Sequence, residues 1–314
     1  MKKQLSQTIF LAIIACLLWS SAFVGVKIGL KYHSPLQFAG IRFLISGLLL
    51  IPVVYDLGRF TKEVKANFGY VCLIGFLQII LQYSLFYMGM SMVPASISAM
   101  IVGSTPLFVA LVAHFTLSGD RMDWSKTVSI LLGILGVAVI TLGRDRLPSG
   151  AGIAMAGVGL LLLSNFVSGI TNVVVARKKQ TISPMVLTSS SLFIGGLSLF
   201  IISIPIEGIH YQSFPLEYFM ALGWLSFLSA AALTIWNTLL RRPTVKVSEL
   251  NIWKFLIPVA GAILSWALLP GESPDVVSVS GMILIASALV ILNLSNRKKK
   301  ASAAPDFESV EVLN

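Results

Sequence analysis

Ten separate apolar runs dominate the chain and divide it into two sets of five. They cover residues 8–30, 35–55, 68–89, 94–117 and 124–143, and then 150–176, 184–206, 216–240, 248–269 and 276–294. The hydrocarbon core of a bilayer needs about 20 apolar residues per helix, so each run predicts one membrane-spanning helix. Only 11% of the residues are charged and the loops are short, so function is predicted to lie inside the helical bundle.

The two sets share Pro, Ser and acidic positions in the same order, which favours a duplicated unit over chance similarity. The matched positions are Ser34, Pro35, Pro106 and Asp120 in the first set and Ser183, Pro184, Pro258 and Glu272 in the second. Because a unit of five spans is odd, its second copy enters the bilayer the other way round, as in the inverted repeats of membrane carriers. The predicted fold is therefore all-α, with ten transmembrane helices in two inverted five-helix repeats around a central cavity. The repeats are expected at 8–143 and 150–295, followed by a disordered cytoplasmic tail at 296–314.

Positive charges are distributed unevenly between the two ends of the predicted spans. Counted from an inside N-terminus, seventeen Lys and Arg residues fall on one side and three on the other. Cytoplasmic loops carry the excess of Lys and Arg, so both termini are predicted to be cytoplasmic in a multi-pass protein of the cell (inner) membrane. Basic loops facing an anionic leaflet account for the net charge of +10. The expected partner is the lipid bilayer, and no nucleic acid is expected.

Polar residues within the spans cluster on particular helical faces. Ser164, Ser168 and Asn172 recur on one face of a helix, and Gln78 and Gln82 form an i, i+4 pair. Buried amides and hydroxyls in lipid need partners, so these faces indicate either a shared cavity or hydrogen bonds between helices without a ligand. The cavity candidates are Trp19, Ser20, Arg42, Gln78, Gln82, Tyr83, Ser98, Thr105, Ser164, Ser168, Asn172, Asn237, Asn251 and Lys254.

Two charged residues lie deep within predicted spans. Arg42 and Lys254 are each about 10 Å from the nearer end of their span at 1.5 Å per residue. Such charges usually face a cavity or a partner, so an anionic group of the substrate is one candidate partner, and snorkelling to the interface is the other interpretation.

Two prolines and two titratable residues have candidate mechanical or coupling roles. Pro106 and Pro258 occupy matching mid-span positions, where loss of a backbone N–H can kink a helix, so they are hinge candidates or simply shape the cavity. His114 and Glu249 are candidates for proton coupling, although a neutral packing histidine is the alternative for His114.

Three segments resemble a known transporter family. Residues 86–123, together with LLWSSAFVGVKIG and LIPVAGAILSWALLPGE, are similar to the third-to-fourth, first and ninth spans of the drug/metabolite transporter superfamily, EamA type. The resemblance implies ten helices around a central cavity that opens alternately to each side and moves small metabolites, often outward. Asp120 stands where the family commonly has Glu, which shortens that side chain.

Several kinds of chemistry lack their motifs in this sequence. No acidic residue lies mid-span, there is no GxxxxGK[ST] loop for ATP, and there is no HExxH or paired-carboxylate cluster. No cofactor, metal site or enzymatic activity is expected. The sequence predicts a secondary transporter that exports small metabolites such as amino acids or related compounds. A channel-like facilitator and an integral membrane enzyme acting on lipid-linked substrates are the alternatives, and a homodimer through peripheral spans is left open.

Overall fold

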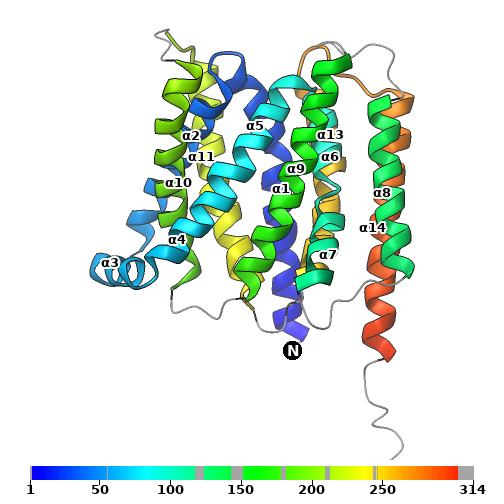
Figure 1. The fold of residues 1–314 in the computed structure, drawn as a ribbon, viewed down its shortest axis with the longest axis horizontal. Helices are drawn as coiled ribbons and strands as arrows, with labels where there is room; N and C mark the ends of the chain where they lie inside the picture. The colour runs from blue at the N-terminus through cyan, green and yellow to red at the C-terminus, as the bar shows by residue number, and fades with distance from the viewer. Residues whose placement is uncertain are drawn as a thin grey trace, which may run out of the picture.

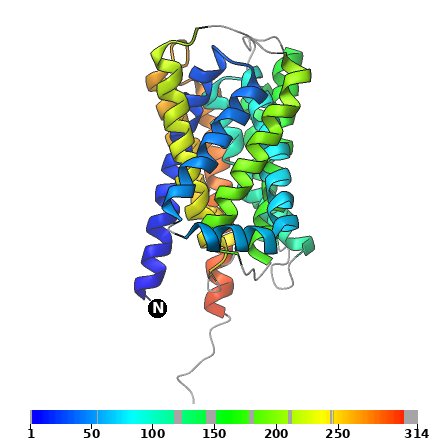
Figure 2. The same ribbon diagram turned by 90° about the vertical axis from the view of Figure 1, so that its left-hand side faces the viewer.

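The protein is a bundle of long helices that run side by side (Figures 1 and 2). The computed structural model describes residues 2–54, 56–116, 124–142, 151–177, 182–208, 213–242, 245 and 247–302. In these segments every regular element is helical, which confirms the predicted all-helical architecture. The N-terminus and the end of the last helix, α14, lie at the same end of the bundle (Figure 1).

The predicted apolar runs correspond to continuous or interrupted helices. The α-helices are α1 (Lys2–Leu30), α2 (Pro35–Leu50), α3 (Leu57–Ala66), α4 (Phe68–Ile74), α5 (Tyr83–Met92), α6 (Ala95–Val102), α7 (Thr105–Thr116), α8 (Trp124–Leu142), α9 (Ala151–Arg177), α10 (Pro184–Glu207), α11 (Leu216–Leu240), α12 (Val247–Ile252), α13 (Leu256–Leu268) and α14 (Val276–Ser302). Three shorter elements connect some of them: a 3-10 turn η1 (Ile51–Val53), a π-helix η2 (Gly75–Gln82) and a 3-10 turn η3 (Trp253–Phe255).

Seven of the described helical segments are long and apolar enough to cross a membrane. They are Ser6–Leu30, Pro35–Val53, Phe68–Met92, Ala95–Thr116, Gly152–Arg177, Pro184–Glu207 and Leu216–Leu240. Three shorter apolar helices, Thr127–Ile140, Leu256–Leu268 and Val276–Ala288, fall within the remaining predicted spans. The last helix, α14, continues to Ser302 and so includes the beginning of the predicted tail, whereas residues 303–314 lie outside the described part of the chain.

Small residues bring the backbones of α2 and α10 into direct contact. A Cβ atom added to Gly196 would lie 2.4 Å from the backbone nitrogen of Leu44, and one added to Gly47 would lie 2.5 Å from the backbone nitrogen of Phe193. In lipid, helices associate through close van der Waals packing rather than through exclusion from water. The glycines are therefore what allows this helix pair to form.

Replacing Gly196 with alanine is expected to destabilise the protein by about 1–3 kcal/mol, because overpacking here meets backbone atoms that cannot move aside. Gly223, in α11, is the matched control, since nothing lies within 4 Å of a Cβ added there. Gly223→Ala is expected to be neutral or slightly stabilising. Thermal unfolding of the purified variants measures both effects, and equal melting temperatures would contradict the prediction.

Two glutamates cap the starts of helices that begin at or directly after a proline. The carboxylate of Glu207 accepts hydrogen bonds from the backbone N–H groups of Leu36 (2.8 Å) and Gln37 (2.9 Å) at the start of α2. Glu272 accepts from those of Ala95 (2.7 Å) and Ser96 (2.8 Å) at the start of α6. A helix N-terminus has unsatisfied N–H groups and a partial positive charge. Each carboxylate therefore ties the end of one apolar helix to the beginning of another.

Substituting Glu272 with glutamine is expected to cost about 1–2 kcal/mol of stability, because the amide keeps one acceptor oxygen but loses the charge and the second acceptor. Glu217→Gln is the control, since the Glu217 carboxylate is exposed and accepts a hydrogen bond from the Tyr32 hydroxyl rather than from a helix N-terminus. Chemical or thermal unfolding compares the two. A larger loss for Glu217→Gln would be the contrary result.

The amphipathic helix α3 was not predicted from the sequence, and it crosses the lower end of the bundle at a steep angle to the spans (Figure 2). Its Glu63 carboxylate accepts from the backbone N–H of Ser183 at 2.7 Å and from the Arg59 guanidinium at 2.8 Å. Burial would raise the pKa of Glu63, but these hydrogen bonds outweigh it and lower the pKa. The contact between α3 and the start of α10 therefore persists at neutral pH.

Candidate functional site

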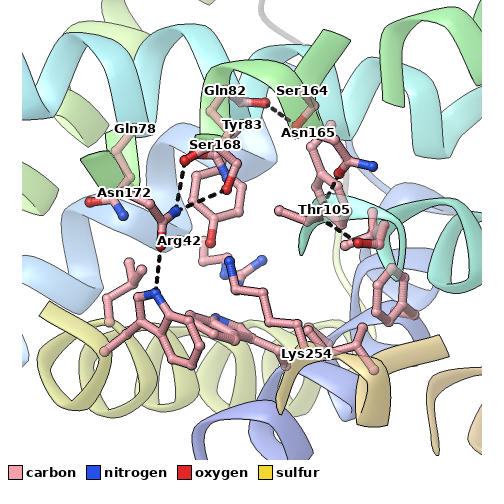
Figure 3. Close-up of a pocket in the computed structure, with 18 residues that line it drawn as sticks. Arg42, Gln78, Gln82, Tyr83, Thr105, Ser164, Asn165, Ser168, Asn172 and Lys254 are labelled. Atoms are coloured by element: carbon pink, nitrogen blue, oxygen red, sulfur yellow. Dashed lines mark hydrogen bonds between the residues drawn. The ribbon is translucent and has the colours of Figure 1, made fainter. Parts of the chain in front are cut away.

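A cavity of about 80 Å³ lies in the middle of the bundle, between spans from both halves of the sequence (Figure 3). Its polar walls come from α2, η2, α7 and α9, and its aromatic and apolar walls come mainly from α1, α11 and α13. The sequence predicted contributions from spans one, three, four, six, eight and nine, and the structure brings these together.

Ten of the fourteen predicted cavity residues line this space. They are Trp19, Arg42, Gln78, Gln82, Tyr83, Thr105, Ser164, Ser168, Asn172 and Lys254. The other four lie outside the lining and have protein partners. Ser20 and Ser98 each donate to a backbone carbonyl one turn earlier in their own helices. The Asn237 side chain donates to the Thr188 hydroxyl, and the Asn251 side chain donates at 3.3 Å to that of Asn172, which does line the cavity.

The polar face of α9 is held in place by hydrogen bonds to neighbouring helices. Ser164 donates to the backbone carbonyl of Gln82 at 3.0 Å, and the Asn172 side chain accepts from the indole N–H of Trp236 at 2.8 Å. Asn165, which neighbours the predicted Ser164, accepts from Thr105 at 2.9 Å and donates to the carbonyl of Ile101 at 2.8 Å. These bonds fix α9 against η2, α11 and the α6–α7 junction.

Two glutamines enter the cavity from a π-helix. Gln78 and Gln82 both belong to η2, a wider helical form that is rare and occurs frequently at functional sites. Among the described residues, neither glutamine side chain has a hydrogen-bond partner in the protein. Their amides therefore offer neutral donors and acceptors to a solute in the cavity.

The Arg42 guanidinium is enclosed by protein groups on all three of its nitrogens. Its side chain is 1% exposed. The Nε donates to Ser229 Oγ at 2.9 Å and to the Leu225 carbonyl at 3.2 Å, Nη2 donates to Ser229 Oγ at 2.7 Å, and Nη1 donates to the Tyr87 hydroxyl. The Phe43 ring centroid lies 4.9 Å from its Cζ atom. Arg42 therefore connects α2, α5 and α11.

Lys254 is the second cation of the cavity, and its environment is different. Its side chain extends from η3 into the cavity (Figure 3), and the residue is only 6% exposed. The Nζ atom lies 4.8 Å from the Trp236 ring centroid and 5.5 Å from that of Trp19. Within the described part of the chain it forms no hydrogen bond and no ion pair. Cation–π contacts are worth about 2 kcal/mol or more when desolvated, but they leave all three N–H donors open.

The residues predicted as hinges lie at interruptions of their spans. Pro106 is at the beginning of α7, after a break that separates it from α6, and Pro258 is at the beginning of α13, after η3. The two interruptions meet, because a Cβ atom added to Gly103 would lie 2.4 Å from the Pro258 ring. Neither proline is therefore a kink inside one continuous helix.

The two candidates for proton coupling are not part of the described lining. His114 is half-buried near the end of α7, where its ring meets Phe115 edge to face at 4.8 Å between centroids. The side chain of Glu249 lies outside the described part of the structure. The described lining residues include two cations and no carboxylate, and the described His, Cys, Asp and Glu residues form no group that would hold a metal ion.

Sequence reasoning did not predict the apolar part of the lining. The apolar residues that reach the cavity are Ala22, Phe23, Phe86, Val102, Leu233 and Ile257, and Trp236 and Asn165 line it as well. Apolar side chains facing lipid and those facing a cavity are alike in a hydropathy profile. A usable indication for Trp236 and Asn165 was their position beside predicted residues.

Comparison with known proteins gives the chain a family. The model of the EamA-like transporter family matches residues 6–142 and again residues 155–294. The chain belongs to the EamA-like transporter family. The EamA assignment confirms the resemblance found in the sequence, and with the apolar helices it makes the protein a multi-pass membrane transporter rather than an enzyme.

Relatives extend over nearly the whole EamA chain. A protein of Escherichia coli (strain K12) named "Probable amino-acid metabolite efflux pump" is 29% identical over 93% of this chain and 96% of its own. The "Uncharacterized transporter YvbV" of Bacillus subtilis (strain 168) is 29% identical over 96% of this chain and 97% of its own. A solved crystal structure, described only as that of a protein, has a TM-score of 0.69 at 18% identity and covers 94% of this chain and 99% of its own. That similarity supports the fold.

Proposed function

We propose that this protein is a secondary transporter that exports small metabolites, such as amino acids or related compounds, through the central cavity. The observation that carries the proposal is a small central cavity between the helices, lined by amides, hydroxyls and Lys254, which has no hydrogen-bond or ion-pair partner among the described residues. Polar groups are costly in lipid and mark solute pathways. The name "Probable amino-acid metabolite efflux pump", printed for relatives in Escherichia coli and Salmonella typhimurium, supports export and the solute class.

Alternating access would follow from ten spans in two inverted repeats. The double match of the family model supports the duplication. The packing pairs support a pseudo-twofold axis: α2 with α10, α8 with α14, and α6 with α13 are equivalent spans of the two repeats. The contacts of α1 with α11 and of α5 with α9 would exchange with each other under the same axis. Such symmetry gives a carrier two equivalent states, one open to each side.

The interruptions before Pro106 and Pro258 are where we propose that the spans bend. Breaks in matching spans expose backbone groups near a solute site in many carriers. Because Gly103 and the Pro258 ring are in close contact, a movement of one interruption would displace the other. The lack of a carboxylate in the described lining favours exchange of solutes, or coupling through His114 or Glu249, over an intramembrane carboxylate relay.

We further propose that both termini and the basic loops face the cytoplasm. The N-terminus and the end of α14 lie at one end of the bundle, together with α3 and its basic residues (Figure 1). Basic loops are retained on the cytoplasmic side. Labelling of single cysteines near Arg59 and Lys178 in intact cells should report the same, inaccessible side for both. Opposite sides would overturn the inverted-repeat arrangement.

Efflux from overexpressing cells tests the transport function. Cells fed with dipeptides and other metabolite precursors should release a characteristic solute faster than cells with an empty vector. Filling the cavity with Ser168→Phe should abolish that excess, whereas Ser91→Phe on an exposed position of α5 should preserve it. Equal release from all cells, or unchanged release by Ser168→Phe, would contradict the proposal. Saturation and counterflow in proteoliposomes would separate a carrier from a channel.

A further inference from the structure

The described cavity lining carries two positive charges and no negative charge to balance them. Arg42 has a protein acceptor on each of its three nitrogens, so at least three of its five N–H donors are used within the protein. Lys254 is more than nine-tenths buried, extends into the cavity and has two indole rings as its contacts there. A buried ammonium without an anion is costly. The group that would complete this site is an anion that arrives with the solute.

The remaining walls indicate what accompanies that anion. Trp19 and Trp236 lie beside Lys254, and Phe23, Leu233 and Ile257 add apolar surface to the lining. Gln78 and Gln82 provide neutral amides that have no side-chain hydrogen bond within the described segments. The cavity volume of about 80 Å³ suits a compact solute. These features fit a small molecule with one carboxylate and an apolar body.

We propose that the substrates are small amphipathic monocarboxylates, recognised through a charge-assisted hydrogen bond from Lys254 to the carboxylate, and that an ammonium group on the solute is not required. The inference rests on the proposed transport function and names the chemical class that the cavity selects. Amino acids then bind because they are carboxylates, and des-amino acids bind at least as well. Cationic amines are excluded.

The exclusion of cations follows from the charges of the lining. The described lining residues supply Arg42 and Lys254 but no carboxylate. An ammonium group would be a third positive charge in a space of low dielectric constant, where the side chains of the described lining offer only amide and hydroxyl oxygens as hydrogen-bond acceptors. Like charges in such a space repel strongly. The ammonium of a zwitterion is tolerated only through the carboxylate beside it.

Four compounds that share one apolar body test the inference. Isocaproate lacks the ammonium group of leucine, isoamylamine lacks its carboxylate, and leucinamide is a cation with a neutral amide in place of the carboxylate. Binding to the purified full-length protein is measured by calorimetry and by quenching of tryptophan fluorescence, because Trp19 and Trp236 flank Lys254. We expect isocaproate to bind at least as tightly as leucine, and about tenfold or more tighter than isoamylamine or leucinamide.

Variants of two lysines test whether Lys254 causes the preference for the carboxylate. Lys254→Met should abolish the preference for isocaproate, Lys254→Arg should restore part of it, and Lys27→Met, a lysine on α1 outside the cavity, should leave it unchanged. Isocaproate that binds no better than isoamylamine, or binding that Lys254→Met does not alter, overturns the inference. Cells that export a permanent cation through the same cavity would also overturn it, while the proposed transport function would stand.

Discussion

Replacing Arg42 with alanine is expected to destabilise the folded protein by about 3–5 kcal/mol, which combines the cost of a large internal cavity with that of orphaned polar groups. The guanidinium holds together α2, α5 and α11 through Tyr87, Ser229 and the carbonyl of Leu225. Without it, the Tyr87 hydroxyl loses its described partner in a fully buried position. Thermal or denaturant unfolding in detergent measures the loss.

Two matched substitutions separate charge from geometry. Arg59 is a second arginine, on the exposed face of α3 with 71% of its side chain accessible, and Arg59→Ala should change stability little. Arg42→Lys retains the charge but not the planar fork, so it should restore only part of the lost stability. An Arg42→Ala protein that unfolds like the wild type but no longer binds solute would instead make Arg42 a substrate ligand.

The sequence located most of the polar cavity because polar residues are rare in an apolar background. Ser164, Ser168 and Asn172 share one helical face, and a face of that kind in lipid must look inward. The same reasoning found Gln78 and Gln82, although no sequence pattern indicated the π-helix to which they belong. A π-helix depends on tertiary packing, which spacing along the chain does not encode.

The depth of a charged residue in its span did not predict which groups surround that charge. Arg42 and Lys254 have similar positions in the sequence pattern, yet the Arg42 guanidinium donates to protein acceptors from each nitrogen, whereas Lys254 has no acceptor among the described residues. The difference depends on Tyr87 and Ser229, which are distant along the chain from Arg42. Helix α3 is a contrasting case, because Leu57, Phe60 and Val64 recur at helical spacing and could have predicted it.

Replacing Lys254 with methionine is expected to reduce transport of a carboxylate solute at least about tenfold, while the empty protein keeps its stability. A hydrogen bond to a charged group contributes about 1.5–3 kcal/mol, and about 1.4 kcal/mol corresponds to a factor of ten in binding. Methionine has a similar length, and its thioether contacts aromatic rings favourably, so the indoles of Trp19 and Trp236 remain packed. Efflux of labelled isocaproate from proteoliposomes measures the first effect, and thermal unfolding measures the second.

The two buried cations thus predict opposite outcomes for equivalent substitutions. Loss of Arg42 removes a connection between three helices, so the main expected effect is a lower stability of the folded protein. Lys254 is proposed to pair with the solute, so its loss should reduce transport while the fold persists. Lys27→Met controls for the loss of a lysine from the same protein. A Lys254→Met protein that unfolds as easily as Arg42→Ala would show that the ammonium, although it has no described acceptor, holds the cavity together, and its assignment to the solute would then be wrong.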